Sequence, residues 1–428
     1  MPFRAVFSGG LVTVFQSIAV ILAFSGIASY LNHRFTKLPS TMGLMAAGIS
    51  FSAILILLGK VGLIDTNHAA EFVTSIDFAD MLLHGMLAFL LFAGALHVDL
   101  SDLKTQRMPV IVLSTVGVMT STFITGSLFW LAAQGFGIEL SFIYALVFGA
   151  LIAPTDPIAV MGLLKKANAP KTLETKIVGE SMFNDGVGVV VFMTILGVAI
   201  GGTQPTVTGV ALFLLEEVIG GALLGLALGY ATFLLLRSIN EYKVEVLLTL
   251  ALTTGGYALA ESIHVSAPIA IVVAGLIIGN HGRELAMSDM TRAHLDTFWE
   301  LIDDVLNAVL FVLIGLEMIA LSFHWSHMGL AVVAILITLL ARLVSVWVPV
   351  NIMRKHRAFS PGAVPILTWG GLRGGISIAL ALSLPPSTER DIILFVTYVI
   401  VIWSILGQGL TLGSLVRKVS SNPVAANT

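Results

Sequence analysis

Val178-Gly179-Glu180-Ser181-Met182-Phe183-Asn184-Asp185-Gly186 decides the fold, because it places two acids and two polar side chains inside an apolar run from about 175 to 200. A span of ~20 helical residues, each rising ~1.5 Å, crosses the hydrocarbon core of a membrane. Asp185 is therefore expected roughly halfway across the membrane.

The polar residues of this stretch share one broad face of the predicted helix. Glu180 and Asn184 are i and i+4, as are Ser181 and Asp185, and such pairs are neighbours on a helix surface. A carboxylate at the centre of a bilayer costs at least ~2.5–3.5 kcal/mol on insertion scales. We therefore interpret the stretch as a functional site rather than as polar groups that only fix helix packing.

Composition indicates a polytopic membrane protein. The 428 residues are 57% hydrophobic and only 11% charged, and the mean hydropathy is +0.98, whereas soluble domains carry about 25% charged residues. The net charge of −3 gives no sign of a nucleic-acid partner. Without cysteine the chain forms no disulfide and no thiolate metal site. We expect neither an enzymatic activity nor a cofactor.

Apolar segments of spanning length predict an all-α fold with thirteen transmembrane helices. Proline, glycine and charged residues separate the segments, as turn chemistry requires. The segments lie at roughly 11–31, 38–59, 79–98, 110–134, 141–163, 175–200, 209–236, 244–262, 266–280, 303–322, 328–351, 362–384 and 391–414.

The basic residues predict the orientation of these helices. Seventeen of the 22 Lys and Arg residues fall in the odd-numbered loops and the C-terminal tail, and three fall in the N-terminus and the even-numbered loops. Cytoplasmic loops carry the excess of positive charge. The N-terminus is therefore predicted outside and the C-terminus in the cytoplasm, with the chain in a plasma or inner membrane. The other two basic residues, Arg342 and Arg373, lie within the eleventh and twelfth spans.

The fifth and twelfth spans are predicted to be interrupted near mid-membrane. The fifth contains Ala153-Pro154-Thr155-Asp156-Pro157, and each proline removes an N–H and clashes with the carbonyl four residues back. The twelfth contains Trp369-Gly370-Gly371-Leu372-Arg373-Gly374-Gly375, whose glycines weaken the helix and let another backbone approach. Backbone groups freed at this depth must face protein or a watery cavity. Asp156 is expected to cap the second half of the fifth helix.

The two interrupted spans are seven apart and run in opposite directions in the predicted topology. Six helices, a linker helix and six inverted helices would make them equivalent members of an inverted repeat. Interrupted segments at matching positions of two halves indicate the midplane binding site of a secondary transporter.

These motifs, in this order and at this depth, resemble the monovalent cation:proton antiporter family 1. This family holds the prokaryotic NhaP-type sodium/proton exchangers and their eukaryotic NHE relatives. The resemblance rests on Pro154 to Pro157, Glu180 to Gly186 and Trp369 to Gly374, and it covers nearly the whole chain. It implies an NhaA-like fold, a homodimer in the lipid membrane, and electroneutral exchange of one Na⁺ or Li⁺ for one H⁺ in sodium and pH homeostasis.

The resemblance also implies the ion ligands. Asp185 would bind the cation and the proton competitively, and Ser181 and the Thr155 backbone would be further Na⁺ ligands. A hard cation prefers such oxygen ligands. Removal from water favours the neutral form of a carboxylic acid, so that H⁺ and Na⁺ can compete for the one group.

Four further residues would support this site. Asn184 would hold the unwound part of the fifth span, and Asp156 would lie where the interrupted helices cross. Glu180 and Arg373 would form a buried ion pair, because an unpaired arginine would oppose protonation of Asp185.

By the same analogy, residues 1–428 are one membrane transporter domain made of two bundles. Residues 108–200 and 328–416 would form the moving core, and 1–107 and 201–327 would form the scaffold that carries the dimer interface. A rigid-body shift of one bundle against the other would give alternating access.

One position departs from the family pattern. Some members carry a Glu before Ala-Gly in the third span as an additional cation ligand or entrance residue, and here Phe92 occupies that place. Asp303 and Asp304, at the start of the tenth span, form either a cytoplasmic funnel that concentrates cations or a solvated helix start.

Three other interpretations stay open from the residues alone. A K⁺/H⁺ antiporter could use the same scaffold, because selectivity depends on cavity geometry. A cation channel would need a pore ring or filter, and no filter-like loop is visible in the sequence. An intramembrane aspartyl protease would need paired catalytic acids, such as Asp156 and Asp185, but the proline and asparagine pattern around them favours ion binding.

Overall fold

The computed structural model describes residues 14–63, 71–73, 76–157, 160–162, 164, 170–201, 207–319, 321, 325–357, 359–360 and 362–420. Within these residues all regular structure is helical and there is no strand, which confirms the all-α prediction. Nine helices of the described ranges are long and apolar enough to cross a membrane. The full count of thirteen crossings stays a prediction.

Helix occurs in each of the predicted apolar segments. The first half of the chain forms α1 (Val14–Leu31), η1 (Asn32–Thr36), α2 (Ser40–Lys60), α4 (Phe78–Asp80), η2 (Met81–Met86), α5 (Leu87–Leu96), α6 (Leu100–Thr105), α7 (Arg107–Val112), η3 (Leu113–Gly117), α8 (Val118–Gly135), α9 (Phe142–Leu151) and α11 (Lys171–Gly201). The second half forms α12 (Val207–Arg237), α13 (Tyr242–Ser262), α14 (Ala267–Ile277), η4 (Ile278–Gly282), α15 (Arg283–Leu285), α16 (Asp289–Leu316), η5 (Glu317–Ile319), η6 (Trp325–His327), α17 (Met328–Arg354), α18 (Ala363–Trp369), α19 (Gly375–Leu382), α20 (Thr388–Trp403), η7 (Ser404–Gln408) and α21 (Gly409–Ser420).

Four predicted spans differ from a plain apolar helix, each for a physical reason. α9 stops after ten residues because Pro154 and Pro157 follow it. α18 and α19 are separated by the glycine-rich residues 370–374. α14 is 11 residues long before η4 continues it, and the first half of α16 carries several acids.

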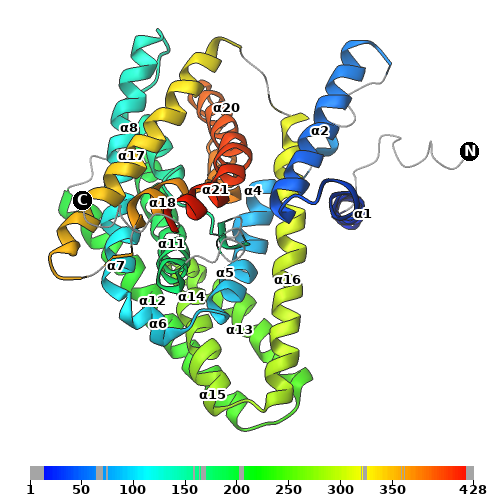
Figure 1. Cartoon of the computed structure of the whole chain (residues 1–428), viewed down its shortest axis with the longest axis vertical. Coiled ribbons are helices and arrows are strands. Elements are labelled where there is room, and N and C mark those ends of the chain that lie inside the picture. Colours follow the sequence, from blue (N-terminus) through cyan, green and yellow to red (C-terminus); the bar gives the residue numbers. More distant parts are fainter. Residues whose placement is uncertain are drawn as a thin grey trace, which may run out of the picture.

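The helices pack in two groups that meet at α5. In Figure 1, α16 runs along one side of the molecule, where α1 and α2 pack against it, and it also contacts α5 and α13. On the other side α8 packs against α9 and α17, and α9 packs against α11. α14 lies between α12 and α5. Residues distant in sequence thus surround the interrupted fifth span.

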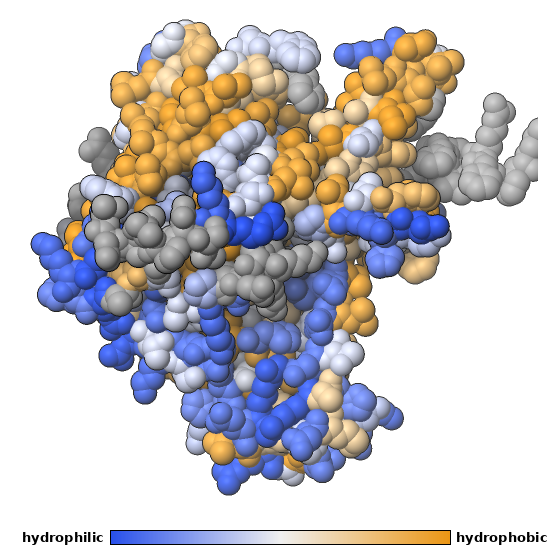
Figure 2. Space-filling model, viewed as in Figure 1, coloured by the Kyte–Doolittle hydropathy of each residue, from blue (hydrophilic) through white to orange (hydrophobic). Residues whose placement is uncertain are grey.

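Large apolar side chains cover the outer faces of these helices. Figure 2 shows hydrophobic residues over α8, α17 and the upper part of α2, whereas the end near α15 is hydrophilic. Exposed examples are Phe123 and Leu131 on α8, and Leu336, Leu340 and Trp347 on α17. Apolar helix surfaces of this kind suit lipid, because every backbone group inside a helix is already hydrogen-bonded. The chain is a multi-pass membrane protein.

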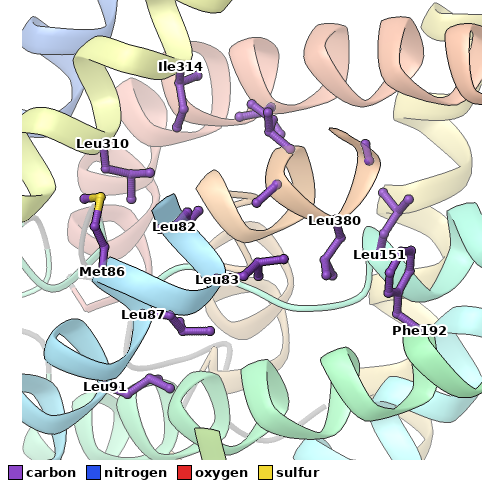
Figure 3. Close-up of a cluster of buried hydrophobic side chains, with 14 of the residues drawn as sticks. Leu82, Leu83, Met86, Leu87, Leu91, Leu151, Phe192, Leu310, Ile314 and Leu380 are labelled. Atoms are coloured by element: carbon purple, nitrogen blue, oxygen red, sulfur yellow. The ribbon is translucent and has the colours of Figure 1, made fainter. Parts of the chain in front are cut away.

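A buried hydrophobic cluster joins the two groups of helices beside the interrupted spans. Figure 3 shows side chains from η2 and α5 meeting others from α9, α11, α16 and α19; the labelled residues are Leu82, Leu83, Met86, Leu87, Leu91, Leu151, Phe192, Leu310, Ile314 and Leu380. Four of these leucines also line the cavity described below. The cluster therefore forms part of the wall of that cavity.

Candidate ion-binding site

The two interrupted spans cross each other in the interior of the protein. The backbone is non-helical over residues 152–157 and again over 370–374, as predicted for the fifth and twelfth spans. The Asp156 N–H donates a 2.7 Å hydrogen bond to the Leu372 carbonyl. This bond joins one interruption directly to the other.

Arg373 binds the carbonyl groups that the first interruption sets free. Its Nη1 donates to the Ala153 carbonyl at 2.5 Å and to the Pro154 carbonyl at 2.9 Å. These carbonyls need partners because the prolines break the helical ladder, and the cation also lies at the negative end of the α9 dipole. The Arg373 N–H donates to Ser404 Oγ at 3.0 Å, which connects the second interruption to η7.

Glu180 pairs with Arg342 on α17, so the predicted pair of Glu180 with Arg373 is wrong. Arg342 Nη2 lies 3.0 Å from Glu180 Oε2, and Arg342 Nη1 donates to Oε1, which makes the pair bidentate. The same guanidinium donates to the Leu367 carbonyl from Nε at 3.3 Å and from Nη2 at 3.1 Å. Both arginines sit within membrane spans, and the order of the chain does not show which one reaches Glu180.

Two glycines of the twelfth-span motif make room for charged side chains. A Cβ atom on Gly371 would lie 2.6 Å from Arg342 Nε, and one on Gly374 would lie 2.5 Å from Asp156 Oδ2. Neither approach is possible for a residue with a side chain unless its neighbour moves. The motif therefore needs glycine for close approach, in addition to any weakening of the helix.

Asn184 connects α11 to the interruption of the fifth span. Its Oδ1 accepts a hydrogen bond from the Thr155 N–H at 3.3 Å, and its Nδ2 donates to Thr155 Oγ1 at 2.9 Å. The Thr155 and Ser181 hydroxyl oxygens are 3.0 Å apart. All three side chains are buried. The structure thus brings Thr155, Ser181 and Asn184 together around the freed backbone.

Asp185 differs from these neighbours because its carboxylate has no partner among the residues that the structure describes. The side chain is only 7% exposed, and it makes no hydrogen bond or ion pair with any residue that the structure describes. It lines a cavity of about 120 Å³, to which Pro154, Thr155, Asp156 and Asp303 also contribute. A buried polar group without a partner is costly and calls for an explanation. A bound cation or proton would supply the missing partner.

The cavity lies between two groups of elements. One wall comes from η2, α5 and α16, through Leu82, Leu87, Leu90, Leu91, Gly94, Asp303 and Leu310. The other wall comes from α11, α19 and the two interruptions, through Pro154 to Pro157, Val178, Met182, Asp185 and Gly374 to Ser377. All charged residues in these walls are acids, so the cavity favours cations.

Two features of the site were not evident from the sequence. Phe92 does not line the cavity: it is fully buried, and its ring centroid lies 4.6 Å from that of Trp299 with the two rings tilted by 49°. Asp303 does line the cavity, whereas Asp304 is exposed. The sequence does not separate the two acids, because an apolar residue follows each by two turns, Leu310 after Asp303 and Phe311 after Asp304.

A membrane-embedded helical bundle with two crossed helix interruptions and an unpaired acid beside them defines a secondary transporter. Residues 19–418 match the family model described as sodium/hydrogen exchanger, transmembrane. The chain belongs to this family, which is a family of transporters.

Similar proteins support this assignment over almost the full length. The Na(+)/H(+) antiporter NhaP of Pseudomonas aeruginosa is 51% identical over 407 residues, which are 94% of this chain and 96% of that protein. The Na(+)/H(+) antiporter NhaH of Halobacillus dabanensis is 34% identical, over 95% of this chain and 98% of that protein. The solved structure of the sodium proton antiporter MjNhaP1 from Methanocaldococcus jannaschii has a TM-score of 0.75 at 20% identity, covering 96% and 100% of the two chains. This last similarity shows a common fold.

Proposed function

We propose that this protein is an electroneutral antiporter that exchanges Na⁺ or Li⁺ for H⁺, with Asp185 as the group that binds either ion. The observation that carries the proposal is the buried, unpaired carboxylate of Asp185 in a cavity whose charged residues are all acids. The similar proteins named as Na(+)/H(+) antiporters support Na⁺ as the cation.

Ionised Asp185 would bind Na⁺ together with oxygens of Thr155 and Ser181, since a hard cation prefers oxygen ligands. Protonation of the carboxylate would remove its charge and release the cation. One site that holds either one Na⁺ or one H⁺ moves no net charge in a cycle. Asn184 fits this scheme, because an amide next to Asp185 offers no second proton.

Because the charges around the site are already paired or hydrogen-bonded, Asp185 would be the group that gains and loses the proton or the cation. Arg342 is neutralised by Glu180 in a bidentate pair. Arg373 is held by the Ala153 and Pro154 carbonyls, which direct its charge to the α9 end rather than to the cavity.

Alternating access is the second part of the proposal. The cavity lies between elements of residues 1–107 and 201–327 on one wall and elements of residues 108–200 and 328–416 on the other. These are the two bundles predicted as scaffold and core, and a rigid-body shift between them would open the cavity to either side in turn. We further propose a homodimer formed through the scaffold in the cell membrane, with the N-terminus outside and the C-terminus in the cytoplasm.

The experiment is a dequenching assay in proteoliposomes that hold a pH-sensitive dye, with Na⁺, Li⁺ or K⁺ added outside. Wild-type protein should respond to Na⁺ and Li⁺, at a rate that a clamped membrane voltage does not change. Asp185→Asn should abolish the response and remain folded, whereas Asp304→Asn, which changes an exposed acid, should keep it.

Two competing interpretations have their own outcomes in this assay. A response to K⁺ that exceeds the response to Na⁺ indicates a K⁺/H⁺ antiporter. A cation flux that follows the voltage and needs no pH gradient indicates a channel. Exchange retained by folded Asp185→Asn refutes the assigned site.

A further inference from the structure

We propose that Asp303 on α16 is a second cation-binding carboxylate, which receives Na⁺ in the cavity before the ion passes to Asp185. The proposal rests on the proposed function and adds a specificity-determining residue to it. It assigns to α16 the entrance ligand that Phe92 in the third span does not supply.

The first support is the position of Asp303 in the cavity. Asp303 and Asp185 line the same cavity from two different helices, Asp303 from α16 and Asp185 from α11. Leu310, which also lines the cavity, follows Asp303 by two helical turns, or about 10.5 Å along α16. Asp303 therefore lies near the middle of α16, on the N-terminal side of Leu310, which belongs to the cluster in Figure 3.

The second support is that Asp303 is held in place. Asn307 Nδ2 donates to the Asp303 carbonyl at 2.8 Å and to Asp303 Oδ1 at 3.1 Å. Asn307 is 6% exposed, so this hydrogen bond is shielded from solvent. Asp303 is thus a fixed carboxylate of the cavity wall, unlike Asp304, which is exposed on the same helix.

The third support is the balance of charge and ligands. A cleft lined by one sign of charge with apolar walls concentrates counter-ions. The Asp185 carboxylate, which has no partner among the described residues, is the final binding position of the entering ion in this proposal. Asp303 is hydrogen-bonded to Asn307 on its own helix, and Asp185 lies on another helix, α11. We assign Asp303 and Asp185 to successive positions of the ion.

Successive binding makes a specific kinetic prediction. Asp303 is in the predicted scaffold and Asp185 in the predicted core, so the distance between them would change as the core moves. Asp303 would then assist loading of the cation and would take no part in its release on the other side. Its loss should raise the Na⁺ concentration needed for half-maximal exchange and leave the maximal rate unchanged.

The test uses full-length Asp303→Asn in proteoliposomes, with the exchange rate measured over a range of Na⁺ concentrations. The apparent KM for Na⁺ should rise about tenfold at an unchanged maximal rate, which corresponds to about 1.4 kcal/mol. The matched control Asp304→Asn should stay within about twofold of wild type, as expected for an exposed substitution. Asp303→Glu, which restores the charge, should return the KM toward the wild-type value.

Binding without transport is the second readout. The midpoint of thermal unfolding in detergent should rise with added Na⁺ for wild type, rise only at higher Na⁺ for Asp303→Asn, and not respond for Asp185→Asn. Equal KM values for Asp303→Asn and Asp304→Asn overturn the proposal, because the effect would then come from the general field of the acids. A folded Asp303→Asn with wild-type KM overturns it as well. Failure of the proposed function is a separate result, namely Na⁺ exchange by Asp185→Asn.

Discussion

Replacing Arg342 with Met would test the charge arrangement that surrounds the site. The change keeps a long apolar side chain but removes the only ion pair of Glu180 that the described residues contain. Glu180 is 1% exposed, so its carboxylate could not regain water. The Leu367 carbonyl would lose two donors in the same step.

The expected loss of unfolding free energy follows from leaving the buried Glu180 carboxylate without its ion-pair partner. Removing one partner of a buried ion pair costs about 3–5 kcal/mol, whereas replacing both partners by uncharged groups is often close to neutral. We therefore expect Arg342→Met to lose about 3–5 kcal/mol of unfolding free energy, and Glu180→Gln combined with Arg342→Met to recover most of it.

The assay is reversible unfolding in mixed detergent micelles, followed by circular dichroism, for a double-mutant cycle of Glu180 with Arg342. The coupling energy should exceed about 2 kcal/mol, in the upper part of the range for contacting residues. A parallel cycle with Arg373→Met is the control, and its coupling to Glu180 should be less than half as large. The structural account is refuted if Arg342→Met costs under about 1 kcal/mol, or if Glu180 couples more strongly to Arg373.

Two further substitutions follow from the same contacts. Gly374→Ala would bring a Cβ atom to 2.5 Å from Asp156 Oδ2, so we expect this variant to displace Asp156 and to lose Na⁺/H⁺ exchange in proteoliposomes. The control Gly413→Ala adds a Cβ atom that meets nothing within 4 Å, and it should exchange ions as the wild type does. Equal exchange by the two variants would contradict the close approach of Gly374 to Asp156. Hydrogen bonds from the Ser101 hydroxyl and from the neighbouring backbone N–H groups hold the pKa of Asp99 below its usual value. Its cap on α6 is therefore fully present above the unfolded pKa of about 3.9 and is lost only as the pH falls through the lower folded value. Asp99→Asn should leave the pH profile of exchange unchanged between about pH 6 and 9, and a shifted profile would show that this cap is coupled to transport.

The interrupted helices could be predicted from the sequence because their cause is local. Pro154 and Pro157 remove backbone donors wherever the segment lies, and the run around Gly374 weakens its helix in any surroundings. The polar face of α11 was predictable for a similar reason, since i,i+4 spacing places Glu180 beside Asn184 and Ser181 beside Asp185.

The pairing of charges could not be predicted because it depends on how distant helices are rotated against each other. Arg342 reaches Glu180 from α17 while it also contacts Leu367 of α18, and three helices must be placed before that contact exists. Gly371 could be interpreted as a flexible residue from sequence, but its role is to leave space for Arg342 Nε. The difference between Asp303, which lines the cavity, and its exposed neighbour Asp304 likewise appears only when α16 is packed against α5.

Calorimetry of Na⁺ binding to the purified protein, in buffers of different ionisation enthalpy, tests the competition at Asp185 most directly, because it counts the protons released for each Na⁺ bound. Wild-type protein should release up to one proton per Na⁺, and fewer as the pH rises and Asp185 is already ionised before the cation arrives. Asp185→Asn should show neither Na⁺ binding nor proton release. Proton-coupled Na⁺ binding by folded Asp185→Asn, or Na⁺ binding by wild type without proton release at any pH, would contradict the account.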